Sequence, residues 1–598
     1  MKWSRLTFLS KALITILITA GIAGIIYMVS PGLRVGISKQ LKGIEVTDSD
    51  VDNVVTADEM ALPSSNPSSK VASQPLVRIG AYAWNAQSGI IVSNGGPRTT
   101  AGSLMEKNNV NLEIIRQDWL SELRNLQVKF VEEYDKGKSY PKEGVFAVMI
   151  MGDGAPYYIS STQQALNDKY GEDKYHLQVV GNVGLSYGED KLIGPPKWKL
   201  DPQTMKGALI STVIGDGDWV TSVNYAFANG LKVNPDPGTY DPDAVNFYPS
   251  ANDDYIESAK ELIKSQREGW TVPLKEVKDG KLTGKTLNRK IDGCATWTPG
   301  DKMVFDELSG FTDIVSTREF NNQMATTVIA VKEWAEKNPQ IVSNILRASY
   351  TASNQMKQYD SWRKRAAECV ANTYQMEDAT YWYNMFKGQK GEKNGITYNM
   401  GGSRVFNLSD AQQYNGLTDG INRYKAVYDQ VSFYLKELNP AGFNQNVSRV
   451  VPYEEAVNLS FLKSIKDIDT GEAYTTDYTE KATKVLASGE WRINFASARA
   501  SIKPEAKDVL EQIYNLLIQA EDAKLELEGH TDNVGNREDN YALSTARAEA
   551  VKSYLMQRGI PGNRFQKVDG KGQDEPVADN ATPAGRAQNR RVVITLLQ

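Results

Sequence analysis

Residues 524–535 read KLELEGHTDNVG, and this stretch decides the fold class of the C-terminal part of the chain. Its first half alternates charged and apolar side chains, as a half-buried strand does. Its second half is a polar turn bracketed by Gly529 and Gly535. The next segment carries an apolar stripe from Leu543 to Leu555 at a spacing of three to four residues, which predicts a helix. The pattern predicts a small α/β domain over residues 486–598.

Four motifs occur in this region in the order Gly-His-Thr-Asp (529–532), Leu-Ser-x-Ala-Arg-Ala (543–548), Gly-x-Gly (570–572) and Asn-Arg-Arg-Val (589–592). Together they resemble the OmpA-like C-terminal domain that is also found in Pal and MotB. The resemblance covers residues 486–598. It implies an α/β sandwich that binds peptidoglycan non-covalently, through the diaminopimelate of its stem peptide.

The ligand-binding pair of that family corresponds to Asp532 and Arg547 in this sequence. Diaminopimelate displays an ammonium group and carboxylates, so Asp532 can accept from the ammonium while the planar guanidinium of Arg547 binds a carboxylate. Asn540 lies two helical turns before Arg547 and shares its face. Thr531 adds a polar group to the turn. Of two neighbouring arginines on the last strand only one can face the groove, and Arg591 is assigned to it.

The first thirty residues differ from the rest of the chain. An apolar run over 12–29 is long enough to cross the hydrocarbon core of a membrane. It exceeds the about 7–15 apolar residues of a cleaved signal peptide and lacks a small-x-small exit. We therefore predict a transmembrane anchor or signal-anchor over residues 1–30. Residues 31–75 are rich in Ser, Pro and acids and predict a flexible linker.

Between residues 76 and 468, strand-like runs alternate with helical stretches, which predicts α/β lobes with mainly parallel sheets. The expected strands are 76–82, 145–151, 177–180 and 314–316, and the expected helices are 103–107, 161–169, 254–267 and 333–352. Ligands of such folds bind beyond the carboxyl ends of strands. The candidate ligand-cleft residues are Trp84, Asn85, Ser88, Asp153, Gly154, Trp297, Thr298, Asp301 and Thr317.

This order of elements resembles a type II periplasmic substrate-binding protein of ABC transporters, of the phosphate, nitrate or sulfonate kind. The segments that carry the resemblance are 78–82, 145–157, 179–191, 295–301 and 314–319. It implies a two-lobed clamp that closes on a small molecule of unknown identity. The alternative for Trp84 and Trp297, plain packing in a core, stays open. Asp218 is interpreted as a helix cap, and residues 469–485 as a second linker.

Composition restricts the chemistry. The 598 residues include 68 Lys and Arg against 73 Asp and Glu, with a net charge of −5, so a nucleic-acid partner is not expected. Two histidines and two cysteines argue against a zinc site. We predict no catalytic residue, no metal site and no cofactor. Cys294 and Cys369 are a candidate disulfide, and two free buried thiols are the alternative.

Peptidoglycan lies outside the cytoplasm, so the resemblance implies a single-pass inner-membrane protein with its bulk in the periplasm of a diderm bacterium. The leading function is a non-enzymatic one: to bind peptidoglycan and to present a receptor for a small molecule. An accessory or structural subunit of an envelope transport or motor complex, with a membrane transport or signalling partner, is the alternative. The membrane run has no ionisable residue, which argues against ion conduction. A cell-wall hydrolase with paired carboxylates is a third possibility.

Overall fold

The computed structural model describes residues 58–598 except 173, 394–395, 440–442, 477, 480, 492, 494 and 496–498. The predicted anchor over residues 1–30 and most of the predicted linker lie outside the described residues. In the part of the chain that is described, no helix is both long and apolar enough to cross a membrane.

The central domain, which we call the clamp (residues 76–468), has two lobes. Lobe 1 contains a six-stranded sheet in the order β16-β4-β13-β3-β1-β2. Strand β1 is parallel to β2 and β3, whereas β13 is antiparallel to β3 and β4. The strands are β1 (Leu76–Ala81), β2 (Asn111–Arg116), β3 (Ala147–Met151), β4 (Leu177–Ser186), β13 (Ala325–Val331) and β16 (Ser403–Val405). A hairpin of β14 (Gln389–Lys393) and β15 (Ile396–Met400) extends from this lobe.

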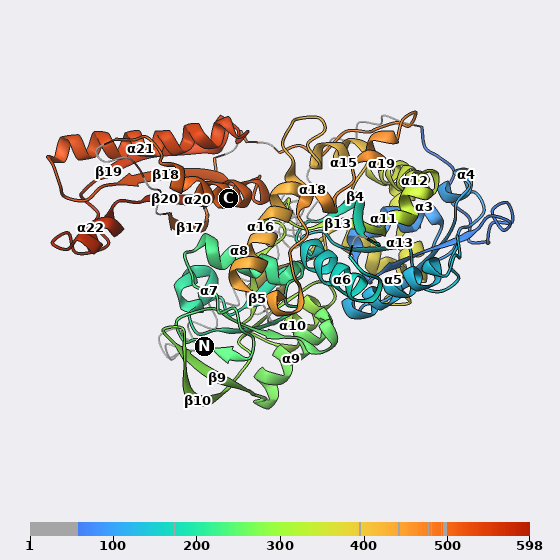
Figure 1. Ribbon diagram of the computed structural model, residues 1–598, viewed down its shortest axis with the longest axis horizontal. Coiled ribbons are helices and arrows are strands. Elements are labelled where there is room, and N and C mark those ends of the chain that lie inside the picture. Colours follow the sequence, from blue (N-terminus) through green and yellow to red (C-terminus); the bar gives the residue numbers. More distant parts are fainter. Residues whose placement is uncertain are drawn as a thin grey trace, which may run out of the picture.

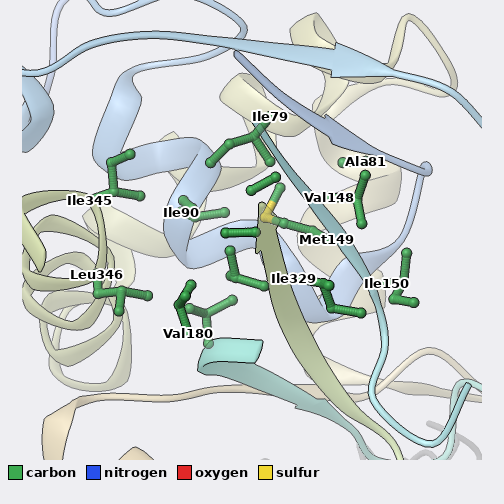
Figure 2. Close-up of a cluster of buried hydrophobic side chains, with 14 of the residues drawn as sticks. Ile79, Ala81, Ile90, Val148, Met149, Ile150, Val180, Ile329, Ile345 and Leu346 are labelled. Atoms are coloured by element: carbon green, nitrogen blue, oxygen red, sulfur yellow. The ribbon is translucent and has the colours of Figure 1, made fainter. Parts of the chain in front are cut away.

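Helices cover both faces of the lobe 1 sheet, so its strands are apolar on both sides, and every residue of β3 and β4 is buried. Ile79, Val148 and Ile329 come from three strands and meet Ile90 of α3 and Leu346 of α12 (Figure 2). Each such side chain contributes about 1.5–3 kcal/mol when it is fully buried. The main helices are α3 (Ser88–Asn94), α4 (Leu104–Lys107), α5 (Leu120–Asp135), α6 (Ala155–Tyr170), α11 (Lys332–Lys337), α12 (Pro339–Gln358), α13 (Asp360–Tyr374), α14 (Ala379–Lys387), α15 (Leu408–Tyr414), α16 (Arg423–Leu438), α18 (Tyr453–Ala456) and α19 (Ser460–Ser464).

Lobe 2 repeats this plan in a five-stranded sheet with the order β12-β5-β11-β6-β8. Strand β6 is parallel to β8 and β11, and β5 is antiparallel to β11 and β12. The strands are β5 (Lys191–Gly194), β6 (Leu209–Thr212), β8 (Asn246–Pro249), β11 (Gly293–Thr296) and β12 (Thr312–Ser316). The helices include α7 (Lys197–Leu200), α8 (Gly217–Ala228), α9 (Tyr255–Glu268) and α10 (Gly300–Glu307), and a side sheet is formed by β7 (Thr239–Tyr240), β9 (Val272–Lys278) and β10 (Lys281–Arg289).

The chain crosses between the lobes twice, at residues 187–190 and 317–324. After each crossover it enters the new lobe as an antiparallel strand, β5 in lobe 2 and β13 in lobe 1. The two-lobed α/β prediction is therefore confirmed. The prediction of mainly parallel sheets is wrong, because these returning strands make both sheets mixed.

Several element boundaries differ from the prediction. The expected helix over 333–352 is two helices, because Pro339 lacks the N–H that would continue α11 and instead begins α12. The expected helix over 161–169 is α6, which already begins at Ala155, and the expected strand over 177–180 continues as β4 to Ser186.

Parts of both predicted linkers pack against lobe 1. The backbone N–H of Met60 donates to Gln355 Oε1 at 2.8 Å, and the indole N–H of Trp362 donates to the carbonyl of Met60 at 3.0 Å. In the second linker, the N–H of Tyr474 donates to Asp410 Oδ1 at 2.8 Å. Polar side chains of lobe 1 thus hold segments whose own sequence has no apolar periodicity.

The C-terminal domain has a four-stranded sheet in the order β17-β20-β18-β19, and it lies at one end of the molecule, coloured red in Figure 1. Its strands are β17 (Val485–Trp491), β18 (Lys524–His530), β19 (Phe565–Gly572) and β20 (Val592–Leu597), and its helices are α20 (Lys507–Gln519), α21 (Arg537–Gln557) and α22 (Pro583–Asn589). The predicted α/β domain is confirmed. Helix α20 packs against α16 of lobe 1.

The candidate disulfide is not formed. Cys294 lies on β11 in lobe 2 and Cys369 on α13 in lobe 1, and both are buried free thiols. They belong to separate apolar clusters, one in each lobe. The two thiols therefore act as small core side chains.

Candidate functional sites

The C-terminal domain has a groove of about 1140 Å³ between the turn after β18, the first half of α21 and α22. Four of the residues predicted from the sequence line it, namely Thr531, Asp532, Asn540 and Arg547. The turn begins where β18 ends, and α21 starts a few residues later with Asn536 as its N-cap. Strand end and helix start thus bring the two halves of the motif together.

Asp532 is the carboxylate at the centre of the groove. Its Oδ1 accepts from the N–H of Val534 at 3.1 Å, and its Oδ2 lies 2.6 Å from Nη1 of Arg590. Arg590 lines the groove, whereas the predicted Arg591 is buried and donates to the carbonyl of Glu575 at 3.3 Å. The assignment of Arg591 to the groove is corrected to Arg590, because neighbouring residues at the start of a strand face opposite sides.

Arg547 lies on α21 and faces the same groove. Its guanidinium lies 5.0 Å from the centre of the Phe495 ring, and its Nε donates to the carbonyl of Arg499 at 3.3 Å. Burial lowers the pKa of Arg547, and the charge of Arg590 lowers it further. A second anionic group next to Arg547 would offset this repulsion. The groove is thus arranged to accept carboxylates.

The polar residues of the turn have different roles. The amide nitrogen of Asn540 lies 3.2 Å from the carbonyl of Asp532 and 3.1 Å from that of Val534, so Asn540 holds the turn that positions the carboxylate. The hydroxyl of Thr531 is buried and makes no hydrogen bond within the described residues. It is therefore free to bind a ligand. His530, which the sequence did not single out as a site residue, is buried behind the turn.

The second site lies where the two lobes of the clamp meet. The ring of Tyr82 in lobe 1 lies 5.4 Å from that of Trp297 in lobe 2, and its hydroxyl lies 3.4 Å from Asp216 Oδ2 in lobe 2. The indole N–H of Trp84 donates to Asp190 Oδ2, in the first crossover, at 3.1 Å. These three contacts join both lobes and the crossover. The predicted Trp84 and Trp297 therefore lie at the contact between the lobes.

Some of the other predicted cleft residues lie at this contact between the lobes, and others lie elsewhere in the clamp. Thr298 donates to Asp301 Oδ2 at 2.9 Å, and the hydroxyls of Thr317 and Ser186 are 2.8 Å apart beside the crossovers. Ser88 instead lines a cavity of about 30 Å³ within lobe 1. Gly154 permits close approach of the lobes, because a Cβ there would lie 1.7 Å from Asp216 Oδ1. Asp153 and Asn85 are fully buried at the same contact.

Four acids that the sequence did not assign to the cleft join Asp153 there. They are Glu189 and Asp190 of the first crossover, and Asp216 and Asp218 at the start of α8. The Gly-Asp-Gly-Asp segment 215–218 reads as a turn followed by a cap. However, Asp216 occupies the N-cap without a side-chain capping bond, and Asp218 lies inside the helix. The cap interpretation of Asp218 is therefore wrong.

The electrostatics of this acid cluster are unusual. Burial raises the pKa of Asp190 to about 7 and that of Asp216 to about 6. Burial also raises the pKa of Asp153 and Asp218 well above the usual range, and neighbouring carboxylates add to both shifts. Lys191 is the cation that acts on this group, and its Nζ is already in contact with Asp301.

The hairpin β14–β15 of lobe 1 extends onto lobe 2 beside the cluster. The carbonyl of Asn399 accepts from Lys191 Nζ at 2.7 Å, and the N–H of Gly401 donates to Thr298 at 3.2 Å. The ring of Tyr398 stacks on Phe305 with centroids 4.2 Å apart. The hairpin thus connects the lobes on one side of the contact.

Comparison with known proteins agrees with this division of the chain. Residues 494–590 match the OmpA family. The chain is similar to "Peptidoglycan-binding protein ArfA" of Mycobacterium tuberculosis, 40% identical over 104 residues, which are 17% of this chain and 32% of that protein. It is also similar to "Outer-membrane lipoprotein YfiB" of Pseudomonas aeruginosa, 39% identical over 103 residues, which are 17% of this chain and 61% of that protein. The chain thus spans from about a third to three fifths of the length of these relatives.

Two solved structures resemble different parts of the chain. The cell wall anchor of the T6SS from Pseudomonas aeruginosa is 38% identical and covers 17% of this chain and 73% of that chain, with a TM-score of 0.15. The periplasmic nitrate-binding protein NrtA from Synechocystis is 9% identical and covers 65% of this chain and 87% of that chain, with a TM-score of 0.44. The C-terminal domain thus contains the OmpA-family match, and the clamp is a two-lobed α/β unit with one mixed sheet in each lobe.

Proposed function

We propose that this protein binds peptidoglycan through its OmpA domain and uses the clamp as a receptor for a small molecule. The observation that carries the first half is the arrangement of Asp532, Arg547 and Arg590 around one groove. An ammonium group competes with Arg590 for Asp532, and the guanidinium groups receive carboxylates. The stem-peptide diaminopimelate supplies both kinds of group. The name of one relative, "Peptidoglycan-binding protein ArfA", supports peptidoglycan as the partner.

The second half rests on the two crossovers of the clamp. Two lobes joined by two short segments can open and close about them. Candidate ligand residues lie on both lobes and on the crossovers, so closure completes the site. The apolar run over residues 12–29 supports an anchor in the inner membrane, and the proposal assigns the clamp and the OmpA domain to the periplasm. The assigned roles are binding roles, not catalytic ones.

The test is co-sedimentation of the purified full-length protein with isolated sacculi that contain diaminopimelate. Asp532→Ala should abolish co-sedimentation, because it removes the acceptor for the ammonium group. Asp508→Ala, at the start of α20 and outside the residues that line the groove, is the matched control and should sediment like the wild type. Equal sedimentation of wild type and Asp532→Ala would contradict the proposal.

A further inference from the structure

The acid cluster of the clamp points to the charge of the small molecule, and this inference rests on the proposed receptor function. Asp153 follows β3 in lobe 1, Asp190 lies in the first crossover, and Asp216 and Asp218 begin α8 in lobe 2. Each of these side chains has a relative exposure of at most 1%. The cluster is thus assembled from both lobes and the segment between them, which is where a clamp holds its ligand.

Several carboxylate oxygens of the cluster have no hydrogen-bond donor. Neither carboxylate oxygen of Asp218 has a hydrogen-bond partner among the described residues, and the same holds for one oxygen each of Asp190, Asp216 and Glu189. Buried carboxylates are normally paired or hydrogen-bonded. Five buried acceptor atoms in one place therefore call for a ligand that brings N–H donors.

The residue that follows Trp84 in the chain gives a further indication. Asn85 is fully buried, and neither atom of its amide has a partner in the described structure. It adjoins Trp84, whose indole binds Asp190. A buried amide with both of its polar atoms unused is what a site for a polar ligand provides.

Aromatic rings surround the same place. The ring of Trp297 lies 4.4 Å from Tyr255 and 5.4 Å from Tyr82, and these three rings come from both lobes. The faces of such rings attract organic cations. No group of three acidic, His or Cys side chains in the described residues has a geometry that would hold a metal ion. The combination favours an organic cation over a metal ion.

The charge balance argues against an anion. Lys191 is in contact with Asp301 and with the carbonyl of Asn399, so two of its three N–H donors are occupied within the protein. A phosphate, nitrate or sulfonate placed among the acids would meet unpaired carboxylates on several sides. Each ionised carboxylate of the cluster would repel an oxyanion, whereas a bound cation would favour the ionised forms.

We propose that the clamp binds a small organic cation, whose ammonium or guanidinium N–H groups donate to Asp218 and Asp190 and whose carbon chain packs against Trp297. Asp218 belongs to lobe 2 and Asp190 to the crossover, so a cation that bridges them stabilises the closed clamp. The ligand enters when the lobes separate about residues 187–190 and 317–324. Contacts of the β14–β15 hairpin with lobe 2 then re-form on closure.

Isothermal titration calorimetry of the purified full-length protein tests this. The probes are putrescine, agmatine and spermidine as cations with N–H donors, choline as a cation without them, and nitrate, phosphate and methanesulfonate as oxyanion probes. We expect binding by an amine or guanidine probe. Asp218→Asn and Asp190→Asn should each weaken it by at least about ten-fold, since each removes a charged acceptor. Asp243→Asn, an exposed acid of the same lobe, should leave affinity unchanged.

Each of the other possible results would overturn a specific part of the proposal. Binding of nitrate, phosphate or methanesulfonate, with no binding of any amine or guanidine probe, would overturn the proposal of a cationic ligand and leave the receptor function standing. Binding of choline alone would overturn the assignment of Asp218 and Asp190 as N–H acceptors. Heat from an amine that is unchanged in both Asp→Asn variants, with normal thermal unfolding of those variants, would place the site elsewhere. No heat from any probe of either charge would overturn the receptor function and the cation with it.

Discussion

Arg423 of the clamp binds Glu521 of the OmpA domain in a two-pronged ion pair. Nε of Arg423 donates to Oε2 at 2.7 Å and Nη2 donates to Oε1 at 2.8 Å. The exposed fraction of the two side chains is only 7% and 13%. Burial by itself would raise the pKa of Glu521, but the hydrogen bonds and charge of Arg423 lower it. The pair is therefore ionised at neutral pH and connects the domains.

The same end of α20 also contacts the second crossover of the clamp. The backbone N–H of Asn322 donates to the carbonyl of Gln519 at 3.0 Å, and its side chain donates to the carbonyl of Ile518 at 3.1 Å. The N–H of Asp522 donates to Asn321 Oδ1 at 3.2 Å. The OmpA domain is thus attached to the second crossover, next to the apolar contact of α16 with α20.

The first prediction concerns this attachment. Glu521→Ala removes the acceptor of a buried guanidinium, and the loss of one partner from a buried pair is costly. Arg423 still contacts Asp419 at 2.8 Å in this variant. We therefore expect a loss of docking free energy of about 2 kcal/mol, which is less than the about 3–5 kcal/mol lost when a buried charge keeps no partner. Small-angle X-ray scattering of the full-length protein should show a larger radius of gyration.

The matched control is Arg558→Ala, which breaks an exposed pair with Glu511 inside the OmpA domain. Exposed pairs contribute little, so its scattering curve should equal that of the wild type. A Glu521→Ala curve that also matches the wild type would show that the apolar contact between α16 and α20 suffices for docking.

The second prediction concerns the guanidinium of Arg547. Arg547→Lys keeps the positive charge but loses the planar fork and the contact with the Phe495 ring. We expect sacculus binding to fall by at least about ten-fold without a change in the circular dichroism spectrum. Arg537→Lys on the same helix is the control, because the side chain of Arg537 is 77% exposed and pairs with Asp574 away from the groove. Equal losses in both variants would argue against a bidentate carboxylate at Arg547.

The groove of the OmpA domain could be predicted from the sequence, because its binding residues lie in short motifs that follow one another in a fixed order. A strand end, a turn and the helix after it place Asp532 and Arg547 close together whatever the rest of the chain does. The choice between Arg590 and Arg591 as the groove residue could not be predicted from the sequence. It depends on which residue begins β20, a boundary that the alternating pattern leaves open by one position.

The acid cluster of the clamp could not be predicted from the sequence in the same way. Asp153, Asp190 and Asp218 come from segments that are far apart in the sequence, and two of them precede or begin helices, where acids are common. Their burial follows from the contact between the two lobes, which local sequence patterns do not encode. The mixed sheets have the same origin, since the direction of β5 and β13 depends on where the chain re-enters each lobe.

The third prediction is that the unliganded clamp becomes more stable as the pH falls from 8 to 5. Burial raises the pKa of Asp190 to about 7 and that of Asp216 to about 6. In the unfolded chain these groups titrate near about 4. Between these values the native state binds more protons, so the free energy of unfolding should rise by about 2–4 kcal/mol. Differential scanning calorimetry of the full-length protein measures this as a rising midpoint.

Asp190→Asn should flatten that slope, because an amide does not titrate, whereas Asp243→Asn should not. The groups that act on Asp190 are Ser186 and Trp84 as donors and Lys191 as a cation, together with the acids Asp301, Glu189, Asp218 and Asp153. None of these substitutions changes them. An unchanged slope in Asp190→Asn, or a midpoint that falls from pH 8 to 5, would contradict the assignment of raised pKa values to this cluster.

The fourth prediction has the opposite sign and concerns the OmpA domain. Burial, together with the charge of Arg591, lowers the pKa of His530 to about 4, whereas the unfolded chain titrates near about 6.5. The unfolded state therefore binds the proton first, and the stabilisation present above pH 6.5 is lost as the pH falls towards 4. We expect the free energy of unfolding to fall by about 1–2 kcal/mol, less than the full pKa shift implies, because solvent screens part of the charge.

Amide hydrogen exchange of β18 and β20 peptides, corrected for intrinsic rates, should show faster opening at pH 5 than at pH 7. His530→Gln should remove this difference, whereas His176→Gln, which changes the chain's other histidine and lies in the clamp, should keep it. Exchange from β18 that is equally slow at both pH values in the wild type would show that His530 is protonated in the native state as readily as in the unfolded chain.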